Sequence, residues 1–158
     1  MKSFAQRPAL TIDPSQKYLA QVHTSRGDFT IDLMPDIAPE HVNSFVFLAR
    51  ENFYDGTVFH RVVPGFVAQG GDPTGTGTGG PGYTVPLEPS KESFARGIVG
   101  MARSQDRDSA GSQWFVTLAD APHLNGQYTV FGKVTQGMET VDSLQIGDAI
   151  VSLDIEEL

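Results

Sequence analysis

FHRVVPGFVAQGGD, residues 59–72, is the stretch that the rest of this chain is organised to hold. A Pro-Gly turn separates two short runs rich in valine and phenylalanine, which predicts a β-hairpin. Three polar side chains, those of His60, Arg61 and Gln69, stand among these apolar residues. Polar groups set in an apolar surface are typical of a pocket wall. An ordinary hairpin whose His60 and Arg61 merely face water remains open on this stretch alone.

The composition indicates one globular domain of mainly β structure. The chain has 158 residues, of which 39% are hydrophobic and 19% charged, and this is enough apolar material for a core of its own. Seventeen glycines and ten prolines favour many turns and few long helices. Because cysteine is absent, disulfides and thiolate metal sites are excluded.

Charge and hydropathy argue against several classes of partner. The net charge of −8 disfavours nucleic-acid binding, which needs a basic surface, and attachment to an anionic membrane. No apolar run has the length of a membrane span, and residues 1–14 lack the apolar centre of a signal peptide. We therefore expect a cytoplasmic protein with no nucleic-acid and no membrane partner.

Alternating patterns predict further strands on both sides of the opening stretch. Residues 1–16 show no periodicity and are expected to form an N-terminal arm, at least partly mobile, before a domain of residues 17–158. Residues 18–24 and 28–33 alternate and predict a hairpin with Gly27 at its turn. Later strands are expected at residues 97–103, 112–119, 129–134 and 149–158.

Two helices are expected between these strands. Pro39 suits a first helical turn, and the apolar stripe that follows has helical spacing, at residues Val42, Phe45, Val46, Ala49 and Phe53. Residues 137–147 predict a short second helix, with apolar side chains at Met138, Val141 and Leu144. Many short strands and two helices favour a closed antiparallel barrel with helices at its ends.

Several familiar types of site do not fit the sequence. Residues 75–80 match G-x-G-x-x-G, but Pro81, Gly82 and Pro86 prevent the helix that a dinucleotide site needs. This segment is expected to be a surface loop whose glycines adopt unusual backbone angles.

The polar residues also argue against metal, triad and glycosidase chemistry. The four histidines have no zinc-ligand spacing, and Ser112 is not in a G-x-S-x-G elbow. Paired acids for glycoside hydrolysis are not visible in a pocket-like segment. Arg61, Gln69 and Gln113 remain, a set that favours hydrogen bonding and electrostatics, because arginine stays protonated.

Four motifs in order resemble the cyclophilin family of peptidyl-prolyl cis–trans isomerases. They are FHRVVPGFVAQGGD (59–72), GMA (100–102), GSQWF (111–115) and VFGKV (130–134), and the resemblance runs from about Tyr18 to the C-terminus. It implies a mainly β fold, a closed eight-stranded antiparallel barrel capped by two helices. It also implies isomerisation of X-Pro bonds that assists protein folding, without a cofactor or metal. Expected partners are proline-containing peptides and flexible or unfolded protein clients, bound by a monomer.

The resemblance also assigns roles to individual residues. Arg61 matches the catalytic arginine, and Gln69 the glutamine that positions it and the substrate backbone. Arg103 replaces a commoner asparagine at an edge that binds peptide backbone. The expected substrate-binding residues are His60, Phe66, Val67, Gln69, Ala102, Arg103, Gln113, Phe115, His123, Leu124 and Tyr128. Plain barrel core stays the alternative for Phe66, Phe115 and Leu124, and a structural role the alternative for His60 and Gln113.

His123 is the clearest departure from the family pattern. It occupies the position of a tryptophan that hydrogen-bonds the drug cyclosporin in many eukaryotic members, so we expect only weak cyclosporin binding. Together with Tyr128, which stands where many members have histidine, it makes the chain resemble bacterial members. Trp114, next to Phe115 in a strand, is expected to point the opposite way. A peptide-binding or chaperone module, in which isomerisation is incidental, remains the alternative function.

Overall fold

The first hairpin follows directly from the alternating pattern of its two strands. In the computed structural model, which describes residues 2–158, β1 (Tyr18–Thr24) buries every second side chain, and β2 (Gly27–Leu33) lies antiparallel to it. Thr24 pairs with Gly27, so two residues form the turn, and the Thr24 hydroxyl donates to the Gly27 carbonyl at 2.7 Å. The predicted hairpin is confirmed.

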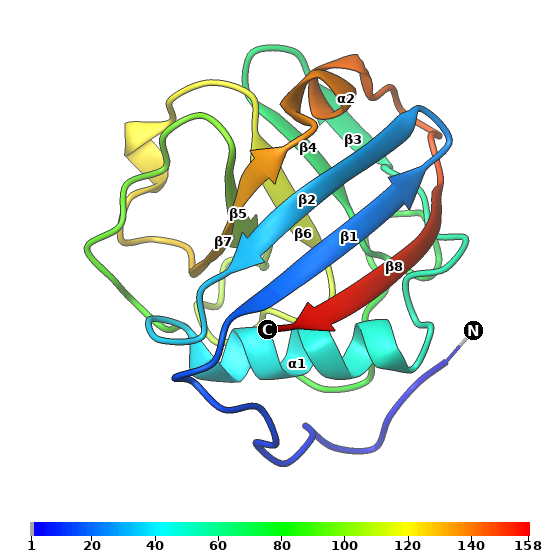
Figure 1. Ribbon diagram of the computed structural model, residues 1–158. Coiled ribbons are helices and arrows are strands. Elements are labelled where there is room, and N and C mark those ends of the chain that lie inside the picture. Colours follow the sequence, from blue (N-terminus) through cyan, green and yellow to red (C-terminus); the bar gives the residue numbers. More distant parts are fainter. Residues whose placement is uncertain (1) are drawn as a thin grey trace.

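The eight strands of residues 2–158 form one antiparallel sheet that curls strongly on itself (Figure 1). Its order is β3-β4-β6-β5-β7-β2-β1-β8. The remaining strands are β3 (Arg61–Val63), β4 (Val67–Gly70), β5 (Ile98–Met101), β6 (Trp114–Thr117), β7 (Val130–Gln136) and β8 (Ile150–Glu157). The predicted hairpin of residues 59–72 corresponds to β3 and β4, and several strands are shorter than the alternation predicts.

Irregular segments, rather than a ladder between the edge strands, close the curled sheet. The segments that precede β3 and β8 bind one another through their backbones. Phe59 N donates to Asp148 O at 2.9 Å, and Gly147 N donates to Phe59 O at 3.0 Å. A single bridge between Val58 and Ala149 joins the same two segments. The hairpin of β3 and β4 is thereby fixed at the end of the barrel wall.

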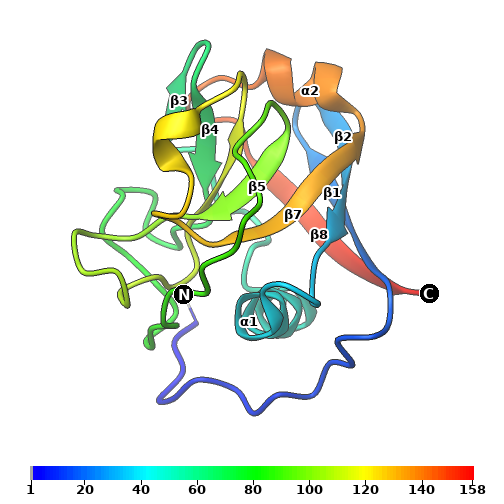
Figure 2. The same cartoon turned by 90° about the vertical axis from the view of Figure 1, so that its left-hand side faces the viewer.

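Two helices cover opposite ends of the curled sheet (Figure 2). α1 (Pro39–Arg50) begins at proline, and the Glu88 carboxylate accepts the N–H groups of Glu40 and His41 at 3.0 and 2.8 Å. α1 ends three residues before Phe53, which is nevertheless buried, so the predicted helix is too long. α2 (Met138–Ser143) is also shorter than predicted. A 3₁₀ helix, Pro122–Leu124, lies between the predicted strands of residues 112–119 and 129–134.

The side chains of β6 separate the core into two clusters. Trp114 belongs to the larger cluster inside the curled sheet, where Phe45 and Phe59 pack against it at centroid distances of 5.8 and 5.9 Å. Phe115 belongs to a smaller cluster with Phe94. Neighbouring strand residues therefore face opposite sides, as predicted for Trp114 and Phe115.

Residues 2–16 contain no helix or strand and run along α1 (Figures 1 and 2). Asn43 on α1 accepts the Thr11 N–H at 3.0 Å, and its own amide donates to the Ala9 carbonyl at 3.0 Å. The Phe4 ring meets the Phe47 ring edge-on at 4.9 Å. Met1, the first residue of the expected arm, lies outside the described residues.

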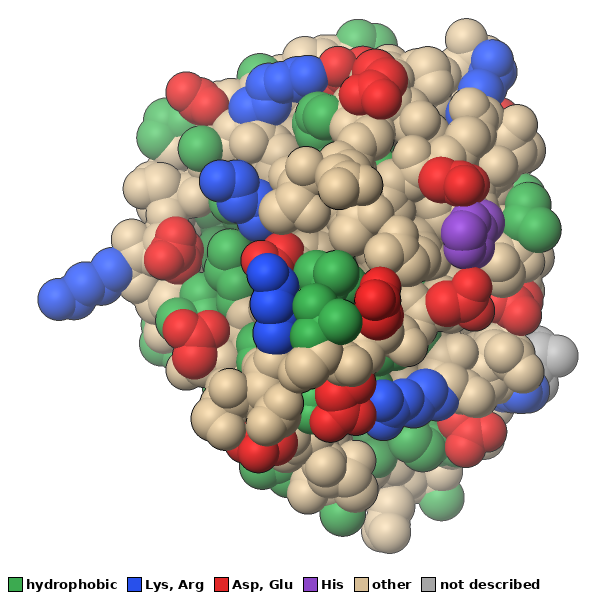
Figure 3. Space-filling model, in the orientation of Figure 1, with side chains coloured by type: hydrophobic (Ala, Val, Ile, Leu, Met, Phe, Trp, Pro, Cys, Tyr) green, Lys and Arg blue, Asp and Glu red, His purple; other side chains and the backbone are tan. Residues whose placement is uncertain are grey.

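The outer surface carries charges of both signs. Figure 3 shows acidic and basic side chains interspersed over the face formed by β1, β2 and β8, with small hydrophobic areas between them. Within residues 2–158, no helix combines the length and the apolar character needed to cross a membrane.

Candidate active site

A small apolar pocket of about 210 Å³ lies beside the β3–β4 hairpin. We call it the apolar pocket. Nine of the twelve predicted site residues line it: Arg61, Phe66, Val67, Gln69, Ala102, Arg103, Phe115, Leu124 and Tyr128. They come from segments far apart in the sequence. The order β3-β4-β6-β5 brings most of them side by side, and the segment between β6 and β7 adds Leu124 and Tyr128. The structure therefore gathers most of the predicted set at one place.

Phe115 forms the buried wall of the apolar pocket. Its side chain is 4% exposed, stacks on Phe94 at 5.6 Å and meets the edge of Tyr128 at 5.9 Å. Gly100 on β5 pairs with Phe115, and a Cβ atom there would lie 2.6 Å from the Phe115 ring. Only glycine leaves room for this ring, because real Cβ atoms do not approach so closely. Phe94 is not among the predicted site residues, because it stands in a segment without periodicity.

A chain of hydrogen bonds holds Arg61 at the mouth of the apolar pocket. Arg61 Nη1 donates to Gln69 Oε1 at 3.4 Å, Gln69 Nε2 donates to Gln113 Oε1 at 3.2 Å, and Gln113 Nε2 donates to the Gly77 and Gly79 carbonyls at 3.0 Å. The register of β3 and β4 makes the first of these hydrogen bonds possible, because it places Arg61 directly opposite Gln69.

The charge of Arg61 is left free for a ligand. Within residues 2–158, no carboxylate forms an ion pair with its guanidinium, whose Cζ lies 5.7 Å from the centre of the Phe66 ring. The side chain is exposed, so a bound molecule can reach it. The arrangement can therefore offer a positively charged hydrogen-bond donor at the edge of an apolar pocket.

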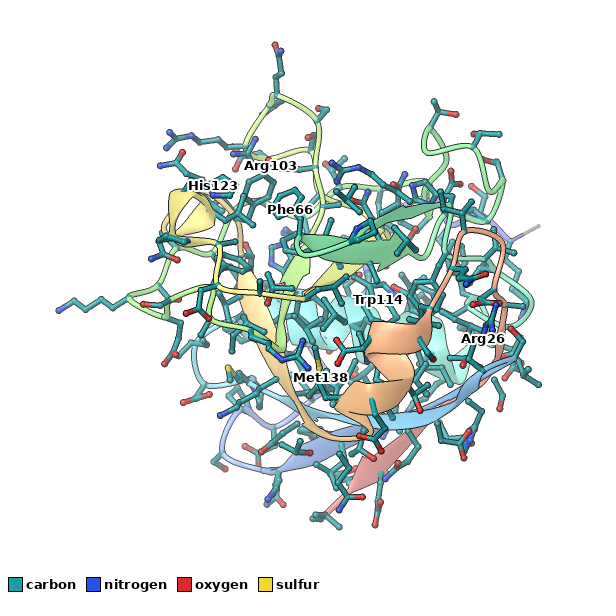
Figure 4. The ribbon with its side chains drawn as sticks, turned by 90° about the horizontal axis from the view of Figure 1, so that it is seen from above. Arg26, Phe66, Arg103, Trp114, His123 and Met138 are labelled. Atoms are coloured by element: carbon teal, nitrogen blue, oxygen red, sulfur yellow. The ribbon has the colours of Figure 1, made fainter. Side chains whose placement is uncertain are left out.

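Three predicted site residues lie outside the apolar pocket. His123 is exposed and stacks on Phe66, with ring centroids 5.5 Å apart. Figure 4 shows Phe66, His123 and Arg103 together on one side of the molecule, with Trp114 deeper inside. The His60 ring lies close to Gly77, and its buried Nδ1 has no hydrogen-bond partner among residues 2–158. Gln113 lines a second cavity instead.

This second, larger cavity of about 760 Å³ adjoins the apolar pocket. The two share Gln69, Ala102 and Arg103 as lining residues. Most of the remaining wall is formed by residues 77–84 together with Ser104, Ser109 and Gln113. No sequence pattern predicted this cavity, because its wall is mostly loop backbone and small polar side chains, which have no periodicity.

Asp72 fixes the glycine-rich loop that forms part of this wall. Its fully buried carboxylate accepts hydrogen bonds from the Thr74 N–H at 2.8 Å, the Thr74 hydroxyl at 2.7 Å and the Thr76 N–H at 3.1 Å. Burial alone would raise the pKa of Asp72, but the hydrogen bonds from Thr74, Gly79 and Gly77 outweigh it and lower this pKa to about 2. Gly77 has φ of +94°, which agrees with the unusual backbone angles expected in this loop.

We expect Asp72→Asn to lower the free energy of unfolding by about 1–3 kcal/mol at pH 7, because the new amide cannot accept the N–H groups that the lost oxygen accepted. Since the pKa of Asp72 is depressed in the folded state, its stabilisation is present above pH 4 and disappears as pH falls towards 2. Urea unfolding of wild type and variant at pH 7 and at low pH measures the difference, which should shrink at low pH. Asp106→Asn, at an exposed loop carboxylate, is the matched control. Equal stability of Asp72→Asn and wild type at pH 7 would contradict this account.

Comparisons with known proteins agree with the geometry of the site. The family model described as cyclophilin type peptidyl-prolyl cis-trans isomerase/CLD matches residues 19–154. A probable peptidyl-prolyl cis-trans isomerase of Brucella suis is 46% identical over 155 residues, covering 90% of this chain and 78% of the relative. Peptidyl-prolyl cis-trans isomerase B of Bacillus subtilis is 48% identical over 127 residues, covering 79% of this chain and 88% of the relative.

A solved structure has the same fold. It is a cyclophilin type peptidyl-prolyl cis-trans isomerase of Cryptosporidium parvum, crystallised in the presence of the dipeptide Ala-Pro. It superposes with a TM-score of 0.82 at 33% sequence identity, covering 87% of this chain and 98% of that chain. The family match over most of the chain, the bacterial relatives and this fold show that the chain belongs to the cyclophilin family and is a peptidyl-prolyl cis–trans isomerase.

Proposed function

We propose that the apolar pocket receives the proline ring and that Arg61 is the catalytic group. The observation that carries this proposal is the exposed Arg61 guanidinium, which no carboxylate of residues 2–158 neutralises and which Gln69 holds at the edge of the pocket. All residues of the pocket fall within residues 17–158, so we propose this range as the isomerase domain.

The chemistry of the peptide bond explains why one arginine is enough. Resonance between the C=O group and the nitrogen creates a rotation barrier of about 18–20 kcal/mol. When the bond is twisted, the prolyl nitrogen regains its lone pair and becomes a hydrogen-bond acceptor. An N–H group of Arg61 aimed at this nitrogen would stabilise the twisted state far more than the planar one, which is the condition for catalysis. Arginine stays protonated throughout, so no proton is transferred.

The surrounding residues would fix the substrate while the bond rotates. Phe115 and Leu124 offer a buried apolar surface for the ring, and Phe66 lies beside it. Excluding water from this surface strengthens the interaction with the Arg61 charge. Gln69 and the backbone at Ala102 and Arg103 lie where they can bind the peptide on either side of the proline.

We propose that the substrates are X-Pro bonds in flexible or unfolded protein chains, whose folding the enzyme assists. Uncatalysed isomerisation of such bonds takes about 10–100 s and limits folding. The pocket opens at the surface beside exposed Arg61, so a peptide segment can enter without unfolding the enzyme. A coupled assay on a short X-Pro peptide tests activity, and peptide titration by NMR tests the place of binding. Resonance changes confined to a surface away from Phe115 and Tyr128 would overturn the assignment of the pocket.

Cyclosporin is expected to inhibit this enzyme only weakly, because His123 stands where many eukaryotic family members have a tryptophan. His123 is exposed at the rim, stacked on Phe66. His123→Trp should lower the inhibition constant by about tenfold or more, since one added hydrogen bond and ring contact is worth about 1–1.5 kcal/mol. Titrating the drug in the peptide assay measures both proteins. Nanomolar inhibition of the wild type would refute the inference from His123.

A further inference from the structure

Arg103 stands between the apolar pocket and the larger cavity and lines both. It directly follows Ala102, and its side chain is half-buried. Figure 4 shows it on the same side of the molecule as Phe66 and His123. A peptide bound in the apolar pocket and extending towards the larger cavity would therefore pass this side chain.

Within residues 2–158, the groups that hold the guanidinium of Arg103 in place are all neutral. Its Nε and Nη2 donate to the Gln127 carbonyl at 3.0 and 2.7 Å, and its Nη1 donates to the Ser104 and Gln105 carbonyls at 2.9 and 3.5 Å. Its Cζ lies 4.4 Å from the centre of the Tyr128 ring. Arginine has five N–H donors, so these contacts leave one donor free for a ligand. They also fix the orientation of the planar guanidinium before a ligand binds.

The positive charge is not neutralised by the cavity walls. Neither cavity has an Asp or Glu among its described lining residues, although the chain carries a net charge of −8. The fully buried Asp72 turns its oxygens to the N–H groups of its own loop. Asp106 and Asp108 accept backbone N–H groups outside both cavities. Lys2 lines the larger cavity, but its ammonium group donates to the Glu51 carbonyl.

We propose that Arg103 is a specificity-determining residue that makes the enzyme prefer substrates with an Asp or Glu side chain near the proline. The carboxylate would enter the larger cavity and receive an N–H group of Arg103. One residue of extended peptide spans about 3.3 Å, so a side chain one to three residues from the proline reaches a cavity that shares walls with the apolar pocket. The inference rests on the isomerase function and on the proline site proposed above.

Matched peptides test this preference on the full chain. They contain one Ala-Pro bond and differ only in having Glu, Gln or Lys at one position, placed in turn one to three residues from the proline on either side. At the best position we expect wild type to show a kcat/KM about three- to tenfold higher for Glu than for Lys. The ratio should fall as salt is added, and the effect should lie mainly in KM, because the ion pair forms in ground and transition states alike.

Two variants distinguish the effect of Arg103 from that of the overall electrostatic field of the protein. Arg103→Gln should bring the Glu:Lys ratio to about one, whereas Arg107→Gln should leave it unchanged. Arg107 is an exposed neighbour that lines neither cavity and donates to the Gln127 side chain at 3.0 Å. Because each ratio is taken within one protein, a smaller folded fraction does not affect it.

The outcomes distinguish this inference from the proposed function. Equal rates for Glu and Lys peptides in an active wild type overturn the role of Arg103 and leave the isomerase function intact. An unchanged ratio in Arg103→Gln, or an equal loss in Arg107→Gln, also overturns it. No activity on any peptide would instead remove the proposed proline site.

Discussion

Arg61→Ala is expected to lower kcat/KM for a short X-Pro peptide by about 100-fold or more, because removing a donor that acts in the transition state costs about 10²–10³ in rate. The side chain is exposed, and the hydrogen bond that it donates to Gln69 is 3.4 Å long. The variant should therefore fold with nearly the stability of wild type. The coupled peptide assay and urea unfolding together separate loss of the catalytic group from loss of the fold.

Two further substitutions serve as a conservative variant and as a control for Arg61→Ala. Arg61→Lys keeps the charge but removes the planar fork, so an intermediate rate is expected. Arg26→Ala is the matched control: it removes an arginine that is paired with Asp148 at 2.8 Å and lies well away from Phe66 and Arg103 (Figure 4). It should leave kcat/KM unchanged. If Arg61→Ala has the wild-type rate, the proposed mechanism is wrong.

Phe115→Ala is expected to lower both stability and activity. Removing a buried phenylalanine side chain costs about 3–5 kcal/mol of unfolding free energy. Here it also removes the stacking on Phe94 and the edge contact with Tyr128. We expect kcat/KM of the folded fraction to fall by at least about tenfold, because the proline ring would lose its main apolar contact, worth about 1.5–3 kcal/mol. Urea unfolding gives the folded fraction by which each rate is corrected.

The neighbouring residue on β6 supplies the control for Phe115. Trp114→Phe also reduces a fully buried aromatic side chain, but Trp114 packs against Phe45 and Phe59 on the other side of the sheet. It should lower the free energy of unfolding while leaving kcat/KM of the folded fraction near wild type. Full activity in Phe115→Ala would show that this ring is core only, which is the alternative that the sequence left open.

The spacing of apolar residues predicted burial better than it predicted backbone conformation. Phe53 and Leu144 continue the helical stripes of α1 and α2, and both are buried. Yet α1 ends at Arg50, and Leu144 is extended, with φ of −62° and ψ of 141°. A side chain can reach the core from a turn or from an extended residue, so periodicity alone does not set the end of a helix.

The motifs predicted the residues that line the apolar pocket. They predicted neither Phe94, which packs behind Phe115, nor the larger cavity beside the pocket. Arg61, Gln69 and Phe115 stand in recognisable segments, and β3, β4 and β6 bring them together. Phe94 and the larger cavity depend on loops whose positions are set by contacts between distant residues. The orientation of Arg103 is an example, because it depends on the carbonyl of Gln127. No local pattern in the sequence encodes such a contact.

The place of β1 in the sheet has a consequence for how this protein is made. β1 lies between β2 and β8, so the first strand of the chain pairs on one side with its hairpin partner and on the other with a strand that follows every other strand. Until the ribosome has added β8, the edge of β1 that pairs with β8 has no partner. An unpaired strand edge can pair with other chains. Pairing of ends so distant in sequence is also slow. Pairing of β1 with β8 therefore follows synthesis of β8, and until then the growing chain carries an unpaired strand edge.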